Sequence, residues 1–162
     1  RTWQKRYSTG HGHKREGAVS MKFSPNAPCP CHSGRKYKKC CRSYHEGSLA
    51  PTPEALMRSR YSAYALNRAE YIIQTTDPEG PMWRTDEATW RADLEAFSTQ
   101  TRFAGLIILA ADTEMVTFRA TLFHGKQDIS FTERSVFRRE DGRWLYTSAQ
   151  EMKDAASDQS NR

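Results

Sequence analysis

Two helical stretches are predicted in the middle of the chain from the spacing of their apolar residues. The first begins at Thr52-Pro53-Glu54, where Thr is a favoured N-cap and Pro suits the first helical position. Apolar residues then recur at helical spacing until Asp77-Pro78. A second, shorter helix is predicted over 87–98, introduced by acidic residues and carrying an apolar stripe of Trp90, Leu94 and Phe97. Such a stripe is typical of core packing.

After residue 101 the apolar spacing changes from helical to alternating, as in strands. The alternation predicts four strands, at 101–110, 115–123, 129–138 and 144–148. Glu140-Asp141-Gly142 between the last two is a strong hairpin signal. Helices followed by a meander of antiparallel strands predict an α+β domain, with the sheet curling around the long helix.

One residue of the third predicted strand breaks its alternation. Glu133 shares the apolar face with Ile129, Phe131, Ser135 and Phe137, so it is predicted to point inward. A carboxylate there is costly unless it is paired, and Arg58 or Arg60 on the long helix is the expected partner in a buried ion pair. The alternative is a cavity carboxylate that anchors a ligand or acts as a general base.

The charge of the chain is divided between a basic front and a mildly acidic body. The net charge is +6; residues 1–20 carry five basic and one acidic residue, and residues 21–45 carry six basic residues and no acidic one. This asymmetry favours an anionic partner for the front, and the alternative is a solvated charge run that keeps the protein soluble. Residues 1–20 and 153–162 are predicted to be flexible tails. No apolar run approaches the roughly 18 residues of a membrane span, and no signal peptide is evident, so a cytoplasmic protein is expected.

The four cysteines lie within thirteen positions, as Cys29-Pro30-Cys31 and Cys40-Cys41. Disulfides would join neighbours or close only short loops, and the spacing is not that of a redox Cys-x-x-Cys pair. Metal ligation fits better, because zinc prefers four thiolates in a tetrahedron and Ser33-Gly34 can reverse the chain between the two pairs. The prediction is one structural zinc ion per chain with a closed coordination shell. Iron is the alternative metal, and His32 and His45 are alternative fourth ligands.

Five cations beside the cysteines would compensate the charge of the thiolates: Arg35, Lys36, Lys38, Lys39 and Arg42. Together they are predicted to form a basic patch that binds an anionic partner, either RNA, the ribosome or an acidic protein. Tyr37 and Tyr44 are candidates for stacking on bases. Because a segment this short cannot bury a core, the metal must supply its folding energy, and we expect 28–42 to fold independently of the body.

The run at 28–41, Pro-Cys-Pro-Cys-His-Ser-Gly-Arg-Lys-Tyr-Lys-Lys-Cys-Cys, resembles the zinc-binding SEC-C motif. The run at 53–64, Pro-Glu-Ala-Leu-Met-Arg-Ser-Arg-Tyr-Ser-Ala-Tyr, and that at 133–144, Glu-Arg-Ser-Val-Phe-Arg-Arg-Glu-Asp-Gly-Arg-Trp, resemble the bacterial YchJ family. The resemblance implies a SEC-C motif over 21–45 followed by a cone-shaped domain, similar to nuclear transport factor 2, over 50–152. Two departures stand out: Thr132 replaces a His frequent in the family, and this chain has no second SEC-C motif after the domain.

Three classes of function are compatible with these features. The favoured one is a non-enzymatic, metal-stabilised module that binds protein or RNA through its basic patch. The second is a small-molecule binder or enzyme that uses a cavity beside Glu133, although no catalytic His and no Ser/His/Asp set accompanies that residue. The third is a carrier or sensor of metal ions.

Overall fold

The computed structural model describes Trp3 and residues 22–153 of the chain. The predicted flexible tails fall almost entirely on residues outside this description, namely 1–2, 4–21 and 154–162. The one exception in the front tail is Trp3, which is 2% exposed and lies in the core. This one residue of the predicted flexible tail is thus part of the core.

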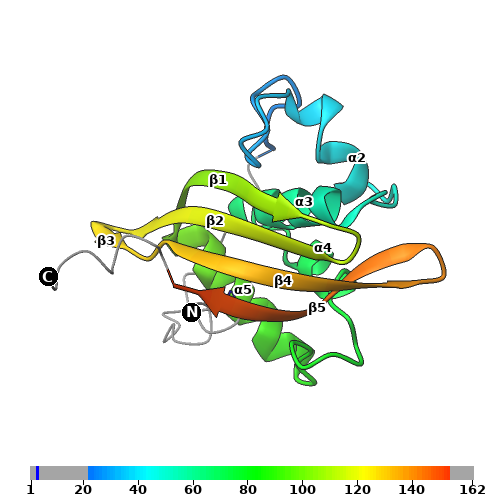
Figure 1. The fold of residues 1–162 in the computed structure, drawn as a ribbon. Coiled ribbons are helices and arrows are strands. Elements are labelled where there is room, and N and C mark those ends of the chain that lie inside the picture. The colour runs from blue at the N-terminus through cyan, green and yellow to red at the C-terminus, as the bar shows by residue number, and fades with distance from the viewer. Residues whose placement is uncertain (1–2, 4–21, 154–162) are drawn as a thin grey trace, which may run out of the picture.

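Three helices cover one face of the sheet: α3 (Pro53–Ala65), α4 (Ala69–Gln74) and α5 (Glu87–Gln100) (Figure 1). Their starts follow from the sequence, since the side chain of Thr52 accepts a hydrogen bond from the Ala55 amide at 3.1 Å and caps α3. Asp86 caps α5 in the same way, through the Thr89 amide at 3.1 Å.

The long helix predicted from residue 53 to Asp77 is in fact two helices, α3 and α4. Asn67 adopts the left-handed conformation, with a φ of 56°. The amides of Asn67 and Arg68 donate back to the carbonyls of Tyr64 and Ala63, at 3.2 and 2.8 Å. This is the Schellman arrangement, which ends a helix and turns the chain, and Asn is one of the few residues that tolerate it. The apolar spacing ran through the break because both helices bury a face against the same core.

The sheet is antiparallel throughout, in the order β1-β2-β4-β5. Its strands are β1 (Arg102–Ala111), β2 (Met115–His124), β4 (Phe131–Glu140) and β5 (Arg143–Met152), and the short β3 (Gln127–Asp128) pairs with the end of β2. Register shifts interrupt β1 twice and the β4–β5 pair once. Such bulges bend strands and increase twist, so they favour curvature around the helices. The predicted α+β class is confirmed.

The core fills the space between helices and sheet. Its largest fully buried side chains are aromatic or long aliphatic: Trp90, Tyr61, Tyr64, Phe118, Phe131, Phe137, Leu56, Met57, Ile72, Leu94, Leu122 and Leu145. None of the described helices is long and apolar enough to cross a membrane.

The cysteine-bearing segment, residues 22–45, forms a small knuckle outside this core. It contains a 3-10 turn, η1 (Tyr37–Lys39), and the short helix α2 (Arg42–His45). Figure 1 shows it, in blue and cyan, beside α3 at one end of the molecule. Its own buried cluster consists of three cysteines and Tyr37, with Leu66 of the body packed against them.

Candidate metal centre

A tight turn presents the first two cysteines on one side of the knuckle. The Cys29 amide donates to the Arg35 carbonyl at 2.8 Å, and Pro28 and Lys36 form an antiparallel bridge. Between them the chain reverses through His32 and Gly34, which have φ values of 60° and 83°. Gly adopts this conformation without steric cost, so the predicted role of Ser33-Gly34 as the reversal matches the backbone.

The 3-10 turn and α2 present the second pair of cysteines. The amides of Tyr37 and Lys38 donate to the carbonyls of Ala27 and Pro25, both at 2.9 Å, which docks the returning chain on the outgoing one. The Cys40 amide closes the turn on the Tyr37 carbonyl at 3.0 Å, and Cys41 stands at the N-cap of α2. Two short local structures therefore place all four cysteines on facing sides of one loop.

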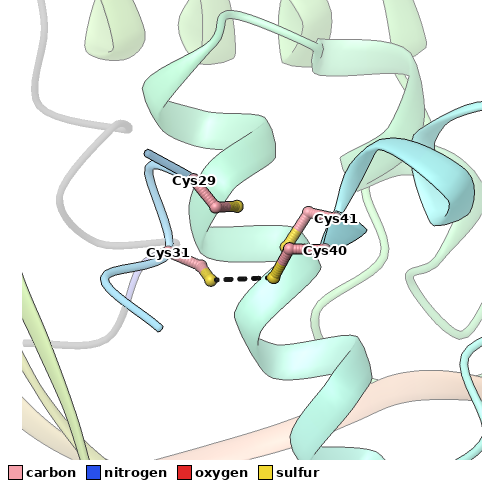
Figure 2. Close-up of side chains that lie close together, drawn as sticks. All are labelled: Cys29, Cys31, Cys40 and Cys41. Atoms are coloured by element: carbon pink, nitrogen blue, oxygen red, sulfur yellow. Dashed lines mark hydrogen bonds between the residues drawn. The ribbon is translucent and has the colours of Figure 1, made fainter. Parts of the chain in front are cut away.

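The four thiols converge with the spacing that a metal ion requires. All four sulfur atoms lie within 4.8 Å of one another; Cys31 Sγ is 3.6 Å from Cys40 Sγ, which is 3.9 Å from Cys41 Sγ (Figure 2). Sulfurs at about 2.3 Å from a tetrahedral zinc ion would lie about 3.8 Å apart. A disulfide would need about 2 Å, and the four thiols are free. The donor set thus fits a single metal ion.

The crowding of the thiols perturbs their ionisation. Hydrogen bonds from Cys29 and Cys41 lower the pKa of the Cys31 thiol, because they stabilise its thiolate. For Cys29, the hydrogen bond with Cys31 is the largest cause and burial a smaller one, and together they raise the pKa of its thiol to about 12. The hydrogen bonds with Cys29 and Cys31 raise the pKa of the Cys41 thiol as well. Four thiolates at this spacing would require a compensating cation at their centre, and a divalent metal ion would supply it.

Both histidines weighed as alternative ligands are engaged elsewhere. His32 Nε2 lies 3.2 Å from the Phe103 carbonyl. His45 Nδ1 lies 2.7 Å from the Tyr37 hydroxyl, and its Nε2 lies 2.8 Å from the Ser59 carbonyl. Because a carbonyl only accepts, Nε2 carries the proton and Nδ1 accepts from Tyr37. In the described part of the chain, the cysteines are the only such group of His, Cys, Asp and Glu that could share an ion.

The basic residues of the knuckle face solvent. Arg35, Lys36, Lys38 and Lys39 are exposed and form no ion pair within residues 22–153, whereas Arg42 pairs with Glu46 at 2.8 Å. Tyr37 is only 2% exposed and meets the Phe23 ring edge-on, so it is not available to stack on a base. Tyr44 is half-buried against the core. The exposed surface of the knuckle therefore offers cations, and neither tyrosine is exposed beside them for stacking on a base.

Polar contacts join the knuckle to the body, which sequence reasoning missed. Besides the His32 and His45 contacts, Arg58 Nη1 of α3 donates to the Cys31 carbonyl at 3.3 Å. The available signal was a pair of serines, Ser59 and Ser62, on the buried face of the predicted helix, where apolar residues are usual. The Ser62 hydroxyl lies 3.3 Å from His45 Nε2 and donates to the Ser59 carbonyl that His45 also contacts. The Ser59 hydroxyl instead donates to the Leu56 carbonyl and contacts the Tyr71 hydroxyl.

Glu133 is fully buried, but its partners are not the expected arginines. Its Oε1 accepts from Ser135 Oγ at 2.7 Å and from Tyr146 Oη at 3.0 Å, and its Oε2 accepts from the Trp3 amide at 3.3 Å. Burial raises the pKa of the Glu133 carboxyl, although these hydrogen bonds oppose the shift.

The two arginines of α3 are satisfied elsewhere, which corrects the predicted ion pair. Arg60 donates to the Ile72 carbonyl at 3.0 Å and to the hydroxyl of Thr75 at 2.7 Å, and it lies over the Tyr146 ring. Arg58 lies at the knuckle and near Glu54. The break after α3 is the physical reason, because it folds the end of α4 back beside Arg60 and offers it a carbonyl and hydroxyls.

Comparisons with known proteins match the two parts of the chain separately. The family description "SEC-C motif" matches residues 26–43, and "YchJ, middle NTF2-like domain" matches residues 52–149. A UPF0225 protein of Deinococcus radiodurans is 43% identical over 131 residues, which cover 80% of this chain and 93% of that protein. One from Streptomyces coelicolor is 42% identical over 134 residues, covering 78% and 97% respectively.

Two solved structures of SEC-C motif containing proteins are similar in fold. The solution structure of one from Rhodopseudomonas palustris has a TM-score of 0.66 at 34% identity, covering 78% of this chain and 100% of that chain. The crystal structure of one from Psychrobacter arcticus has a TM-score of 0.57 at 26% identity, covering 75% and 79%. The cone-shaped domain with a front cysteine motif, inferred from the resemblance, is thus confirmed.

Proposed function

This chain belongs to the YchJ family of SEC-C motif proteins, and on that premise we propose that it is a non-enzymatic, zinc-stabilised RNA-binding protein. The observation that carries the proposal is the convergence of four sulfurs, at zinc-like spacing, inside a segment whose exposed charges are all positive. The metal would shape the knuckle, and the knuckle would present the basic patch to the phosphates of a structured RNA.

Zinc is the metal that this donor set favours. Four protein thiolates leave no coordination position for a substrate or water, which is the character of a structural site. Three of the four cysteines are at most 3% exposed, so the ion would not exchange freely with solvent. This enclosure supports a structural ion over a metal that is carried and released, and the proposed stoichiometry is one ion per chain.

RNA is the partner class that the patch favours. Residues 22–45 contain no acidic residue, and the exposed cations Arg35, Lys36, Lys38 and Lys39 follow closely along one turn. Protein interfaces usually depend on buried aromatic or apolar anchors. In the described knuckle no large apolar side chain is exposed. Cations without such anchors suit a phosphate backbone, whose recognition needs charge and hydrogen-bond donors alone.

The test is binding of a fluorescently labelled RNA hairpin to the full chain across a series of salt concentrations. Four phosphate contacts predict that affinity falls with salt along a log–log slope of about −3 to −4. The variant Lys36→Glu/Lys38→Glu/Lys39→Glu should bind at least tenfold more weakly and keep its metal content.

A matched control separates the patch from net charge. Lys126→Glu/Arg134→Glu/Arg143→Glu changes the total charge equally, at exposed positions outside the knuckle, and should leave affinity within about threefold. An equal loss of RNA affinity in both variants, or full binding by the lysine variant, would show that the basic patch is not the binding surface. Tighter salt-dependent binding to polyglutamate than to the hairpin would indicate that the partner is an acidic protein and not RNA.

A further inference from the structure

Trp3 occupies an aromatic cage at the centre of the core. Its ring stacks on Tyr64, with centroids 4.4 Å apart and planes inclined by 11°. Phe131 meets it edge-on at 4.9 Å and 88°. The cage is completed by rings whose centroids lie 5.9 to 6.5 Å from Trp3: Tyr61, Phe97, Phe103 and Phe118. Stacked and edge-on neighbours together define the position and the plane of a flat group.

The cage and its occupant come from different parts of the chain. All six cage residues lie within 52–149, the range matched by the YchJ domain. Trp3 lies outside this range and outside the SEC-C match at 26–43. The domain therefore builds the cage, and a segment beyond both matched ranges supplies the side chain that fills it.

Glu133 gives the cage a fixed hydrogen-bond acceptor. The domain itself holds Oε1, through the hydroxyls of Ser135 and Tyr146. Oε2 instead accepts from the occupant, through the Trp3 backbone amide at 3.3 Å. A carboxylate among aromatic rings is costly, and an apolar residue would serve core packing better. One oxygen of Glu133 is held by the domain and fixes the orientation of the carboxyl group, while the other oxygen accepts from the occupant. This is the arrangement expected of a group that binds a ligand.

We propose that the aromatic cage is a binding site for a molecule with a planar aromatic group of about indole size and an amide N–H attached beside it, and that Trp3 closes the site as an internal ligand. Tyr64 and Phe131 bind the plane of the molecule, and Glu133 Oε2 accepts from its N–H. This site is independent of the metal and goes beyond RNA binding. Because Trp3 is tethered, it competes at an effective concentration in the millimolar range.

The probe is N-acetyl-L-tryptophanamide, which carries both the indole and the amide N–H of Trp3. Its binding to the full chain is measured by titration calorimetry. Trp3→Ala should bind it at least tenfold more tightly than the wild type does, because the competitor is gone. Indole, which lacks the amide N–H, should bind Trp3→Ala several-fold more weakly than the probe.

Two variants serve as controls. Trp3→Phe keeps the cage filled and should behave as the wild type. Trp83→Ala removes a tryptophan that packs edge-on against Trp90, 5.2 Å away, outside the cage, and should not expose a site. No binding by a folded Trp3→Ala chain, or equal binding by the wild type and Trp3→Ala, would overturn the proposal.

A measurement on the wild type keeps the test decisive if Trp3→Ala does not fold. The chain is labelled with 5-fluorotryptophan, and the Trp3 resonance is identified as the one missing from Trp3→Phe. Saturating probe should move this resonance alone toward its position in unfolded chain. If it stays in place at every probe concentration up to tens of millimolar, Trp3 is a core residue only and the cage is not a binding site.

Discussion

His45 links the knuckle to α3, and the link should make stability depend on pH. Burial lowers the pKa of His45 to about 4, so the ring is neutral in the fold near neutral pH. In the unfolded chain the pKa of His is about 6.5, so below this pH the unfolded chain binds a proton that the folded chain does not bind. Stability due to this residue is therefore complete above about pH 6.5 and is lost as pH falls toward 4.

The matched variant His45→Gln removes this titration. Between pH 7 and 4.5 the wild type should lose about 2 kcal/mol more unfolding free energy than the variant, measured by urea unfolding at both pH values. His124→Gln, at an exposed position, should follow the wild type. Parallel pH profiles for wild type and His45→Gln would show that His45 titrates alike in both states.

Glu133 should act in the opposite sense. Its raised pKa means that the folded state holds a proton which the unfolded state releases above about pH 4.5, so stability falls as pH rises through the folded pKa. Glu133→Gln removes the charge and keeps an oxygen for Ser135 and Tyr146, while its NH2 group takes the place of the oxygen that accepts from the Trp3 amide.

Urea unfolding of Glu133→Gln tests this assignment. From pH 4.5 to pH 7.5 the wild type should lose unfolding free energy relative to the variant, because only the wild type must either keep a proton or bury a charge at this position. Glu95→Gln, at an exposed position, should be neutral at both pH values. If the unfolding free energy of the wild type does not fall relative to that of the variant between pH 4.5 and pH 7.5, the ionised carboxylate is well compensated in the fold.

For single residues, the sequence predicted which side chains point into the core more reliably than it predicted their contact partners. Strand alternation placed Glu133 inward because the side-chain period of a strand is fixed by its backbone. Its partners could not be found in the same way, because Tyr146 and Trp3 reach it only through the folded arrangement. Arg60 was a reasonable candidate by type and helix face, but α4 offered it closer acceptors.

The turn between α3 and α4 depends on Asn67, which holds a conformation that Gly would adopt more easily. Asn67 holds a positive φ, and its Oδ1 is buried without a hydrogen-bond partner among the described residues. Asn67→Gly should stabilise the protein by about 0.5–1 kcal/mol, since Gly adopts this conformation freely and carries no buried oxygen. Asn67→Ala should cost about 1 kcal/mol. Urea unfolding of both variants checks the order, and an Ala variant more stable than the Gly variant would contradict it.

The other helices and strands were predicted from local sequence signals, and the structure shows the same capping and alternation. Capping residues set the starts of α3 and α5, and alternation located the four long strands to within a few residues. The break after α3 was missed because apolar periodicity reports which faces are buried, and two helices that bury faces on one core preserve it. Asn67 was the available signal, but Asn at a helix end is common and does not by itself specify a turn.

In the whole molecule the knuckle contacts the body, and these contacts favour coupled unfolding over the independent folding expected from the sequence. His45 contacts the Ser59 carbonyl, Arg58 donates to the Cys31 carbonyl, and His32 reaches Phe103 of β1. Each hydrogen bond is worth about 1 kcal/mol. Losing the fold of the knuckle should therefore lower the thermal transition of the body by roughly 12–24 °C.

Calorimetry with and without a strong chelator measures this coupling. The matched control is the chain with its four cysteines changed to Ser, in which the chelator should have no effect. A shift of less than about 2 °C in the wild type would show that the knuckle unfolds on its own.

Elemental analysis of protein purified without chelator tests most directly whether Cys29, Cys31, Cys40 and Cys41 together hold one zinc ion. The expected result is close to one equivalent of zinc per chain, lost when any of the four is changed to Ser, because three thiolates leave the shell open. Less than about half an equivalent of any transition metal, or iron in place of zinc, would contradict it.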